Sequence, residues 1–486
     1  MNSSRIISLR NLCIIAFFAI FLCSPAAAQE KKEPSRWDWF MKAYQRGGGA
    51  LQLHYAYDME DDGPEAGDTE GYSRKEDLWE TRLKLYAWAE FKPWRKAKIH
   101  LSAITFEYIA GRDPDESVVL ESVYRLPNEA YLMQSIGRFD FTVGYQKQKW
   151  GVNQFLSPTN NLNPSELRGF IDPDPEDIVI PIPMVKGVFF ITDFIFIEGI
   201  YIPLFYKSQF HIFHTDFALC REEAICQVNP EEYVPDEDIP ESEQWEAGAR
   251  IRAEIGDFTL EANYLHTRED FPVFILPKDS EGNVVEDPHI TRTYPTYDIM
   301  GGGIGWRYKK VALKVEAAYS PKRQYTVAGG WHTPIGGEDR TLPLLLAGDS
   351  PSYTWALEAE YAPSRQLYLL LSYEEIRLTD APDPDDPDEP QLLLSSEITR
   401  LALLLGKIDI FRERLVFKLG AVYFIDDDDY ILTPRIAFKA GDHIELSVGA
   451  NVLQGERADT NKLGGVAPVS LYSDADQVFA GFRYNF

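Results

Sequence analysis

Long apolar runs are almost absent from this chain. After residue 28, no segment approaches the roughly 18 consecutive apolar residues that a membrane-spanning helix requires, which argues against a helical membrane protein. The one strongly apolar run, residues 13–22, follows Arg5 and Arg10 and precedes three alanines at 26–28. This arrangement is typical of a secretory signal peptide with its cleavage site. We therefore assign residues 1–28 to a signal peptide and expect an exported protein.

Cysteine is also scarce. Of the 4 cysteines, only Cys220 and Cys226 follow the predicted signal peptide. In the oxidising compartment that a signal peptide implies, we expect these two to form a disulfide that closes a small loop, with two free thiols as the alternative. No histidine and no second cysteine pair lies at a spacing typical of metal ligands, so the sequence predicts no metal site.

Basic residues are outnumbered, with 48 Lys and Arg against 76 Asp and Glu. Without Arg5 and Arg10 the balance is 46 against 76, a net charge of −30, which disfavours nucleic-acid binding through the overall field. Some of the acid gathers in clusters at 172–177, 383–389 and 426–429. None has the glycine-centred spacing of a calcium loop, so solvated surface loops are favoured over calcium or lipopolysaccharide-bridging sites.

Recognisable catalytic motifs are missing too. None of the 8 histidines lies beside a serine or an acid in a nucleophile motif such as G-x-S-x-G. A catalytic site split between distant strands stays open as an alternative. We predict a protein that is not an enzyme and carries no cofactor.

Alternation of apolar and polar residues is what the chain has in abundance. In "DLWETRLKLYAWAEF" (Asp77–Phe91), one register holds Leu83, Leu85 and Phe91, and the other holds Arg82, Lys84 and Glu90. The same period of two recurs from residue 245 to the last residue of the chain. It predicts strands with one apolar face and one wet face.

Short and long connections alternate between these strands. Short turns are expected at 92–96, 137–138, 192–193, 256–257, 309–310, 363–365, 406–409 and 441–442. Longer polar loops are expected at 59–76, 111–122, 151–183, 206–242, 270–293, 321–350, 379–390 and 455–474, with one short outer connection at 426–429.

These breaks delimit about 18 strands, with 16–18 as the range we consider. Several strands run to 10–14 residues, as a tilted membrane crossing requires, whereas strands of soluble β-domains average about 5–6 residues. Aromatic residues gather near strand ends, as in the girdles of membrane barrels. We therefore predict an all-β fold, a transmembrane antiparallel β-barrel with short periplasmic turns and long extracellular loops, over a soluble sandwich or propeller.

The expected organisation is a signal peptide (1–28), a periplasmic N-terminal tail (29–49) and a barrel (50–486). The last residues, "ADQVFAGFRYNF", alternate and end on Phe486. This segment resembles the closing strand of bacterial outer-membrane barrels, in which the terminal Phe belongs to the signal read by the barrel-insertion machinery. The resemblance implies a Gram-negative outer membrane, with outer-membrane lipid and lipopolysaccharide as surroundings.

Charged residues on the polar register are expected to line the interior. Those of most interest as pore or substrate-binding residues are Arg82, Lys84, Arg250, Arg252 and Arg435. Charges on a water-filled wall select solutes. Arg–Glu pairs that brace neighbouring strands are the equally favoured alternative.

The connection at 151–183 follows the fifth predicted strand and is the third outer loop. It is long and rich in Asn, Pro and Asp, and loops longer than about 12–15 residues are usually functional or disordered. We expect Trp150 to anchor at the rim, Gly151 to let the chain turn inward, and Asn163 to cap a helical turn at 165–168. If the loop folds inward, its selectivity residues are Asn153, Asn161, Arg168 and Asp172; an outward loop packed on its neighbours is the alternative.

The segment that leads into this loop carries a family resemblance. "NEAYLMQSIGRFDFTVGYQKQKWGVNQFLSPTNNLNP" (Asn128–Pro164) resembles a pattern in outer-membrane porins of the alginate-export-like and related uncharacterised proteobacterial families. Members often have Arg where this chain has Lys147. Lys147 and Lys149 extend a register that faces lipid, although a bulge would turn them inward. An alginate exporter would need a strongly cationic interior, and the mixed wall here does not imply that substrate.

The function that these observations favour is an outer-membrane channel for diffusion of small polar solutes, narrowed by an inward third loop. The alternatives are an exporter or importer of a polysaccharide or hydrophobic compound, and a structural or adhesive barrel.

Overall fold

The structure, a computed structural model, describes residues 43–59, 79–111, 119–167, 178–210, 236–275, 291–335, 338–382, 391–392, 397–412, 414–455 and 476–486. Several predicted features lie outside these residues: the signal peptide, residues 29–42 of the tail, Arg168, Asp172, Cys220, Cys226 and the acidic clusters at 172–177 and 383–389. Within the described part of the chain, no helix has the length and hydropathy to cross a membrane.

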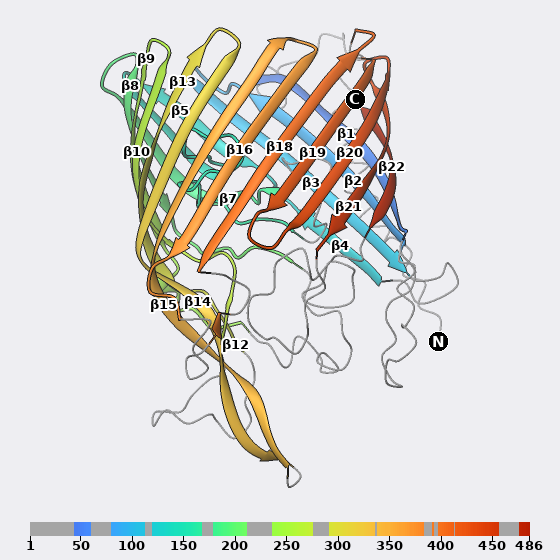
Figure 1. Ribbon diagram of the computed structural model, residues 1–486. Helices are drawn as coiled ribbons and strands as arrows, with labels where there is room; N and C mark the ends of the chain where they lie inside the picture. Colours follow the sequence, from blue (N-terminus) through green and yellow to red (C-terminus); the bar gives the residue numbers. More distant parts are fainter. Residues whose placement is uncertain are drawn as a thin grey trace, which may run out of the picture.

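One antiparallel sheet makes up nearly all of the described chain (Figure 1). Its first half contains β1 (Tyr44–Asp58), β2 (Trp79–Phe91), β3 (Ala97–Gly111), β4 (Val119–Arg125), β5 (Ala130–Ile136), β6 (Phe139–Gln146), β7 (Ile182–Phe190), β8 (Ile195–Ile202), β9 (Glu246–Ile255) and β10 (Phe258–Arg268). Its second half contains β13 (Thr296–Tyr308), β14 (Val311–Ile335), β15 (Glu338–Ser364), β16 (Leu367–Leu378), β17 (Gln391–Leu392), β18 (Ile398–Ile410), β19 (Leu415–Phe424), β20 (Asp429–Ala440), β21 (Ile444–Gln454) and β22 (Gln477–Asn485). A separate small pair is formed by β11 (Val273–Ile275) and β12 (Thr291–Thr293), and a single 3-10 turn spans Glu241–Glu243.

The sheet closes on itself because β1 pairs with both β2 and β22. β4 and β5 pair with different parts of β3 and together complete one barrel strand. The two-residue β17 pairs only with the far part of β14. The protein is therefore a closed antiparallel barrel of 18 strands, as the alternation predicted.

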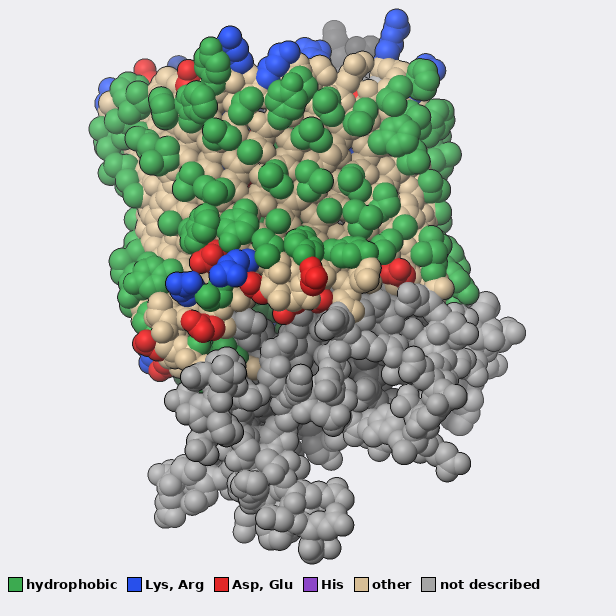
Figure 2. All heavy atoms as spheres, in the orientation of Figure 1, with side chains coloured by type: hydrophobic (Ala, Val, Ile, Leu, Met, Phe, Trp, Pro, Cys, Tyr) green, Lys and Arg blue, Asp and Glu red, His purple; other side chains and the backbone are tan. Residues whose placement is uncertain are grey.

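The outer face of the barrel is apolar. On β10, Leu260 and Tyr264 are 41% and 45% exposed, whereas Glu261 between them is buried. Figure 2 shows hydrophobic side chains covering the wall, with Lys and Arg along the edge that carries the short turns. The period of two in the sequence thus becomes an apolar exterior and a polar interior, which is the arrangement of a barrel in a lipid bilayer.

Most of the predicted short turns lie where expected, including those at 92–96, 137–138, 256–257, 309–310 and 441–442. The turn predicted at 406–409 is wrong, because β18 continues through Gly406 to Ile410 and the next strand, β19, begins at Leu415. Gly406 lies in the strand interior and pairs with Leu369 on one side and Leu419 on the other, so it does not break the ladder. β1 begins at Tyr44, so residues 44–49, assigned to the tail, belong to the first strand.

The loop predicted at 321–350 is instead a continuation of β14 and β15, which run 25 and 27 residues. The two strands pair from Val311↔Tyr361 to Ile335↔Glu338, with a register shift at Ser320/Arg323. In Figure 1 this hairpin projects well beyond the end of the barrel that carries the long connections. Residues 321–350 have the polar composition of a loop. They nevertheless form two strands, because each strand supplies the hydrogen-bond partners for the backbone of the other.

Candidate functional site: a loop segment held inside the barrel

The chain turns into the barrel directly after β6. Gly151 has a φ of +91°, a backbone conformation that favours glycine, and a Cβ there would lie 2.2 Å from Ser157 Oγ. Trp150 is fully buried and its indole Nε1 donates to Glu198 Oε1 on β8 at 2.7 Å. The rim position predicted for Trp150 is therefore wrong, because its ring packs among interior side chains, whereas the predicted role of Gly151 as a turn is confirmed.

An apolar cluster surrounds the Trp150 ring within the barrel. It contains the buried side chains of Leu162, Ile182, Met184, Ile200, Ile202, Leu265, Tyr297, Ile299 and Ala318. Leu162 comes from the same loop, and the others come from strands β7, β8, β10, β13 and β14 or from their ends. Burying a tryptophan in a packed interior is among the larger single stabilising contributions. The cluster therefore fixes the point at which the loop enters.

Glutamates on the inner wall bind the backbone of the loop as it proceeds. Gly151 N donates to Glu261 Oε1 at 2.7 Å, and Val152 N donates to Glu316 Oε2 at 2.9 Å. Gln154 N donates to both carboxylate oxygens of Glu358, at 2.9 and 2.8 Å. Glu261, Glu316 and Glu358 lie on β10, β14 and β15, so the loop runs sideways along the wall and not along the barrel axis.

Glu316 is the centre of this arrangement and is 0% exposed. Besides Val152 N, its carboxylate accepts from Asn153 N at 3.0 Å, Ser157 Oγ at 2.7 Å and Thr159 N at 3.1 Å, and from the hydroxyl of Thr159. Donors from residues 152–159 thus surround the Glu316 carboxylate of the wall. Hydrogen bonds to a charged group contribute about 1.5–3 kcal/mol each, so the set compensates the desolvation of a buried charge.

Glycines of the wall make room for the loop. β13 contains the run Gly301-Gly302-Gly303, and Gly301 and Gly303 lie in the inward register. A Cβ at Gly303 would lie 2.6 Å from Val152 Cγ2, and one at Gly301 would lie 2.4 Å from Thr159 Cγ2. Glycine inside a strand commonly marks a close approach of another segment. These residues therefore form a groove that the loop fills.

Beyond Leu162, the described residues of the loop are held by bonds to neighbouring segments. Asn163 does not cap a helical turn: its Oδ1 accepts from Gln148 N at 2.8 Å, and its Nδ2 donates to Gln146 O and Ile180 O. Ser165 and Glu166 form bridges to Val179 and Gln209. The predicted turn at 165–168 is wrong over its described residues, because these cross-segment bonds take the backbone groups that a helical turn would use.

The loop asparagines proposed for selectivity have internal partners. Asn153 is 1% exposed and its Nδ2 donates to Leu156 O at 2.8 Å, while Asn161 Nδ2 donates to Pro158 O at 3.0 Å. Their amides therefore stabilise turns within the loop. The Lys149 side chain donates to Gln154 O, which places it with the inward segment, the arrangement expected from a bulge after the strand.

The predicted interior arginines fall into two groups. Arg250 pairs with Glu198 and Glu261 at 3.2 and 3.3 Å, and Arg252 pairs with Glu261 at 3.3 Å and with Glu254 at 3.1 Å. The guanidinium of Arg250 also lies 5.8 Å from the Trp150 ring. These two arginines brace the glutamates that hold the loop.

The second group lies on other strands. The Arg82 guanidinium lies over Phe106 at 4.6 Å and Tyr108 at 5.4 Å, and the Lys84 ammonium lies 5.9 Å from Phe106. Arg435 donates to Glu445 and to Ser447, both at 3.2 Å. These three belong to β2, which pairs with β1, and to β20, which is separated from β22 by β21.

Alternation in the sequence puts Glu261, Glu316 and Glu358 on the polar register, but it does not distinguish them as loop anchors, and it does not single out Glu198. An available signal was the triple glycine of β13, which is unusual in a strand and lies beside the anchor strands β10 and β14. Alternation shows that a residue faces inward, but it does not show at what height.

Among solved structures, the chain is similar to OmpF of Salmonella typhi in complex with daunomycin, at 10% identity and a TM-score of 0.41, covering 91% of this chain and 97% of that chain. It is similar to OccAB1 of Acinetobacter baumannii at 8% identity and a TM-score of 0.46, covering 91% and 96%. It is also similar to the outer-membrane channel DcaP of Acinetobacter baumannii at 10% identity and a TM-score of 0.38, covering 91% and 96%.

No curated protein matches the chain. One family model does match, over residues 75–406, and its description is "Protein of unknown function (DUF1302)". The alginate-export-like resemblance of residues 128–164 stays a prediction. The matched range covers most of the barrel, including the third loop and all four anchoring glutamates, and the chain belongs to the DUF1302 family.

Proposed function

We propose that this protein is a channel of the Gram-negative outer membrane through which small polar solutes diffuse, and that residues 150–162 narrow its interior. The observation that carries the proposal is the row of hydrogen bonds between the backbone of residues 151–155 and the inward glutamates 261, 316 and 358. A segment bound in this way occupies part of the barrel interior but is not itself a strand of the wall. It is therefore suited to set the width of a passage.

In this proposal the two groups of interior arginines act differently. Arg250 and Arg252 position the loop through their ion pairs with Glu198 and Glu261. Arg82, Lys84 and Arg435 lie on strands that do not hold the loop, and their positive charges select solutes. Arg82 and Lys84 are each only 6% exposed, so they act through their electric field and not by direct contact. The loop's own contribution is an ordered surface, because its prolines and bound amides limit the conformations available to it.

Conductance in planar lipid bilayers tests the proposal. We expect the purified full-length protein to give discrete, reproducible conductance steps. In the double variant Glu316→Ala with Glu358→Ala, the loop loses most of its anchors, so we expect larger and noisier steps.

The matched control is Glu254→Ala with Glu360→Ala, which removes the same charge from the interior. Glu254 pairs with Arg252 and Glu360 pairs with Lys314, and neither carboxylate contacts the loop among the described residues. Equal conductance in the two double variants would contradict the role of the loop. Absence of conductance in all three proteins would overturn the channel itself and favour a structural or adhesive barrel.

A further inference from the structure

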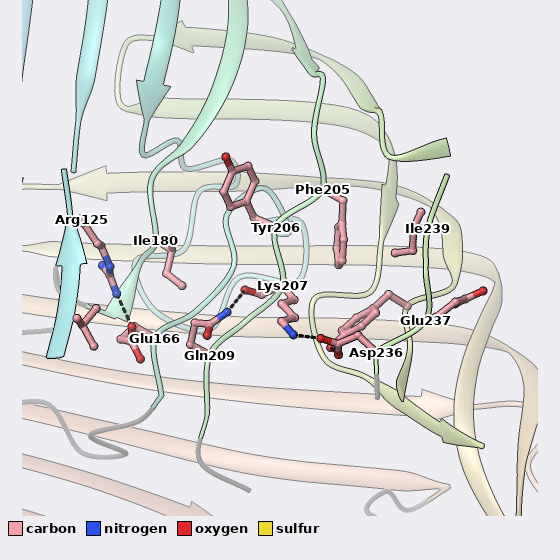
Figure 3. Close-up of a pocket in the computed structure, with 12 residues that line it drawn as sticks. Arg125, Glu166, Ile180, Phe205, Tyr206, Lys207, Gln209, Asp236, Glu237 and Ile239 are labelled. Carbon is pink, nitrogen blue, oxygen red and sulfur yellow. Dashed lines mark hydrogen bonds and ion pairs between the residues drawn. The ribbon is translucent and has the colours of Figure 1, made fainter. Parts of the chain in front are cut away.

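A cavity of about 450 Å³ lies beside the third loop, at the end of the barrel that carries the long connections (Figure 3). Four stretches of chain meet around it: the end of β4, the third loop at Glu166 and Ile180, the segment 205–209 that follows β8, and residues 236–239 with Tyr294. Its volume is in the range of small-molecule sites, which are about 300–1,000 Å³. None of the loop-anchoring glutamates lines it, so it is separate from the segment described above.

Four of the five charged side chains that line the cavity are paired, and the fifth, Glu237, is exposed to solvent. Arg125 Nη2 donates to Glu166 Oε2 at 2.7 Å on one side, and Lys207 pairs with Asp236 on the other (Figure 3). Asp236 also accepts from the Tyr294 hydroxyl at 2.8 Å and lies 3.0 Å from Arg292 Nε. Because the exposed Glu237 is screened by solvent, a charged ligand inside the cavity would have to break one of these pairs or remain uncompensated, and both carry a large cost.

The remaining wall is apolar and ordered. Val123, Ile180, Phe205 and Ile239 contribute hydrocarbon or aromatic surface. The Phe205 ring is fixed by the Tyr294 ring, with centroids 5.2 Å apart, and by Arg268, whose guanidinium lies 5.8 Å from it. The Tyr206 hydroxyl is turned to Tyr145, at 3.3 Å, so the tyrosine presents mainly its ring.

One polar group between the two ion pairs has unused capacity. Gln209 Nε2 donates to Lys207 O at 3.2 Å, and among the described residues nothing donates to Gln209 Oε1. A ligand hydroxyl or amide N–H can therefore bind at this oxygen while an apolar body packs against Phe205 and Ile180. Apolar lining with a few placed polar groups is typical of sites that fix a ligand's orientation.

We propose that this cavity binds a small neutral amphipathic molecule, one with a ring or short hydrocarbon body and hydroxyl or amide groups. Because Glu166 and Ile180 belong to the third loop, the bound molecule contacts the same loop that narrows the interior. If the bound molecule is a transported solute, the role of the cavity rests on the proposed channel function. Binding of the molecule in the cavity does not rest on that function.

Calorimetric titration of the full-length protein in lipid nanodiscs tests the proposal. The probes are phenyl β-D-glucopyranoside, which is neutral, and phenyl β-D-glucuronide, which has the same body and a carboxylate. We expect the neutral probe to bind at least about tenfold more tightly, since the anion would be buried beside charges that are already paired. Equal affinities, or tighter binding of the glucuronide, would overturn the proposed ligand class.

Two substitutions locate the binding. Ile180→Trp fills the cavity without removing either ion pair, and we expect it to weaken binding of phenyl β-D-glucopyranoside at least about tenfold. Ile136→Trp adds the same side chain at an outward position that is 67% exposed, and we expect no change. Binding that survives Ile180→Trp would place the probe elsewhere and refute the site.

Bilayer conductance of the same proteins keeps the two proposals apart. Conductance steps without binding of phenyl β-D-glucopyranoside would refute the cavity as a site and leave the channel standing. Binding without conductance steps would do the reverse.

Discussion

Single residues decide where the third loop lies. Glu316 gathers the donors of residues 152–159, and Gly151 lets the backbone turn toward it. Gly303 is needed because it has no side chain, and any side chain there would occupy the space of Val152. A buried carboxylate is costly unless it is well bonded, so Glu316 and the loop depend on one another.

Substitution of Gly303 by valine should dislodge the loop. The added atoms overlap Val152, and overpacking of this kind typically costs about 1–3 kcal/mol. Hydrogen exchange measured by mass spectrometry should become faster for residues 151–159. Gly199→Val is the control, because a Cβ at Gly199 meets nothing within 4 Å. Unchanged exchange in Gly303→Val would contradict the groove.

Asp236 provides a pH-dependent contact beside the cavity described above. Burial raises its pKa, but hydrogen bonds from Lys207 and Tyr294 and the nearby charges of Arg292 and Lys207 outweigh this, so the pKa lies below its ordinary value of 3.8. A depressed carboxyl pKa contributes stability above the unfolded value and loses it as the pH falls through the folded value. The contact should therefore be intact at pH 7 and pH 5 and be lost only below about 3.8.

The measurement is the difference in hydrogen exchange of residues 205–209 between Asp236→Asn and the unmodified protein at each pH. We expect a constant difference above pH 4 that shrinks below it. Asp238→Asn, a neighbouring exposed carboxylate, should show no difference. A difference that already fades near pH 6 would mean that the carboxyl is not stabilised in its charged form.

At the scale of elements, the β14–β15 hairpin differs from the other strand pairs. Its neighbours stop early: the β13–β14 ladder ends at Met300↔Tyr319, and the β15–β16 ladder ends at Ser352↔Leu378. Beyond these points the hairpin pairs with itself and, over two residues, with β17. From residue 320 to residue 335 an extended strand covers roughly 50 Å, so the hairpin reaches far from the barrel.

Removal of residues 328–346, with a short glycine turn in their place, should leave the barrel intact. The deleted part pairs mainly with itself, so neither ladder of the barrel wall loses a partner. We expect the conductance steps to be unchanged. We also expect no change in the temperature at which half of the protein loses the folded band on an electrophoresis gel. A fall in either would show that the hairpin supports the wall.

At the scale of the whole molecule, the barrel is held closed by the pairing of its first and last strands. The β1–β22 ladder runs from Ala50↔Asn485 to Asp58↔Gln477. Phe486 extends it, because Gly49 N donates to Phe486 O and Phe486 N donates to Gly49 O, each at 3.0 Å. Closure removes both free sheet edges, which a bilayer cannot accommodate.

Deletion of Phe486 removes both of these hydrogen bonds, so the thermal midpoint of the purified barrel should fall. The expected loss of unfolding free energy is about 1–3 kcal/mol, since the net contribution of one hydrogen bond to stability is about 0.5–1.5 kcal/mol. Phe486→Leu keeps the backbone pair and should keep the midpoint. If the terminal aromatic ring is also read during insertion, Phe486→Leu should lower the amount of protein in the outer membrane. Equal midpoints for all three proteins would contradict the role in closure.

Alternation was sufficient to predict the barrel, because each strand has one face toward apolar surroundings and one toward the interior. Residues 321–350 were misassigned because their strands pair with each other outside the barrel, where neither face must be apolar. The inward loop was one of two alternatives, and the sequence could not decide between them. The decision rests on contacts such as Asn153 with Glu316, which are 163 residues apart, and no local pattern encodes that register.

The same separation sets an order of assembly. Gln154 meets Glu358 only after 204 further residues have been added and positioned, and contacts so distant in sequence form late because closing the intervening chain costs entropy. While the first strands pair, the third loop has nothing to bind. The wall must therefore reach β15 before Gln154 can bind it, so a nascent barrel lacks the bound segment inside it and acquires this segment among the last steps of its folding.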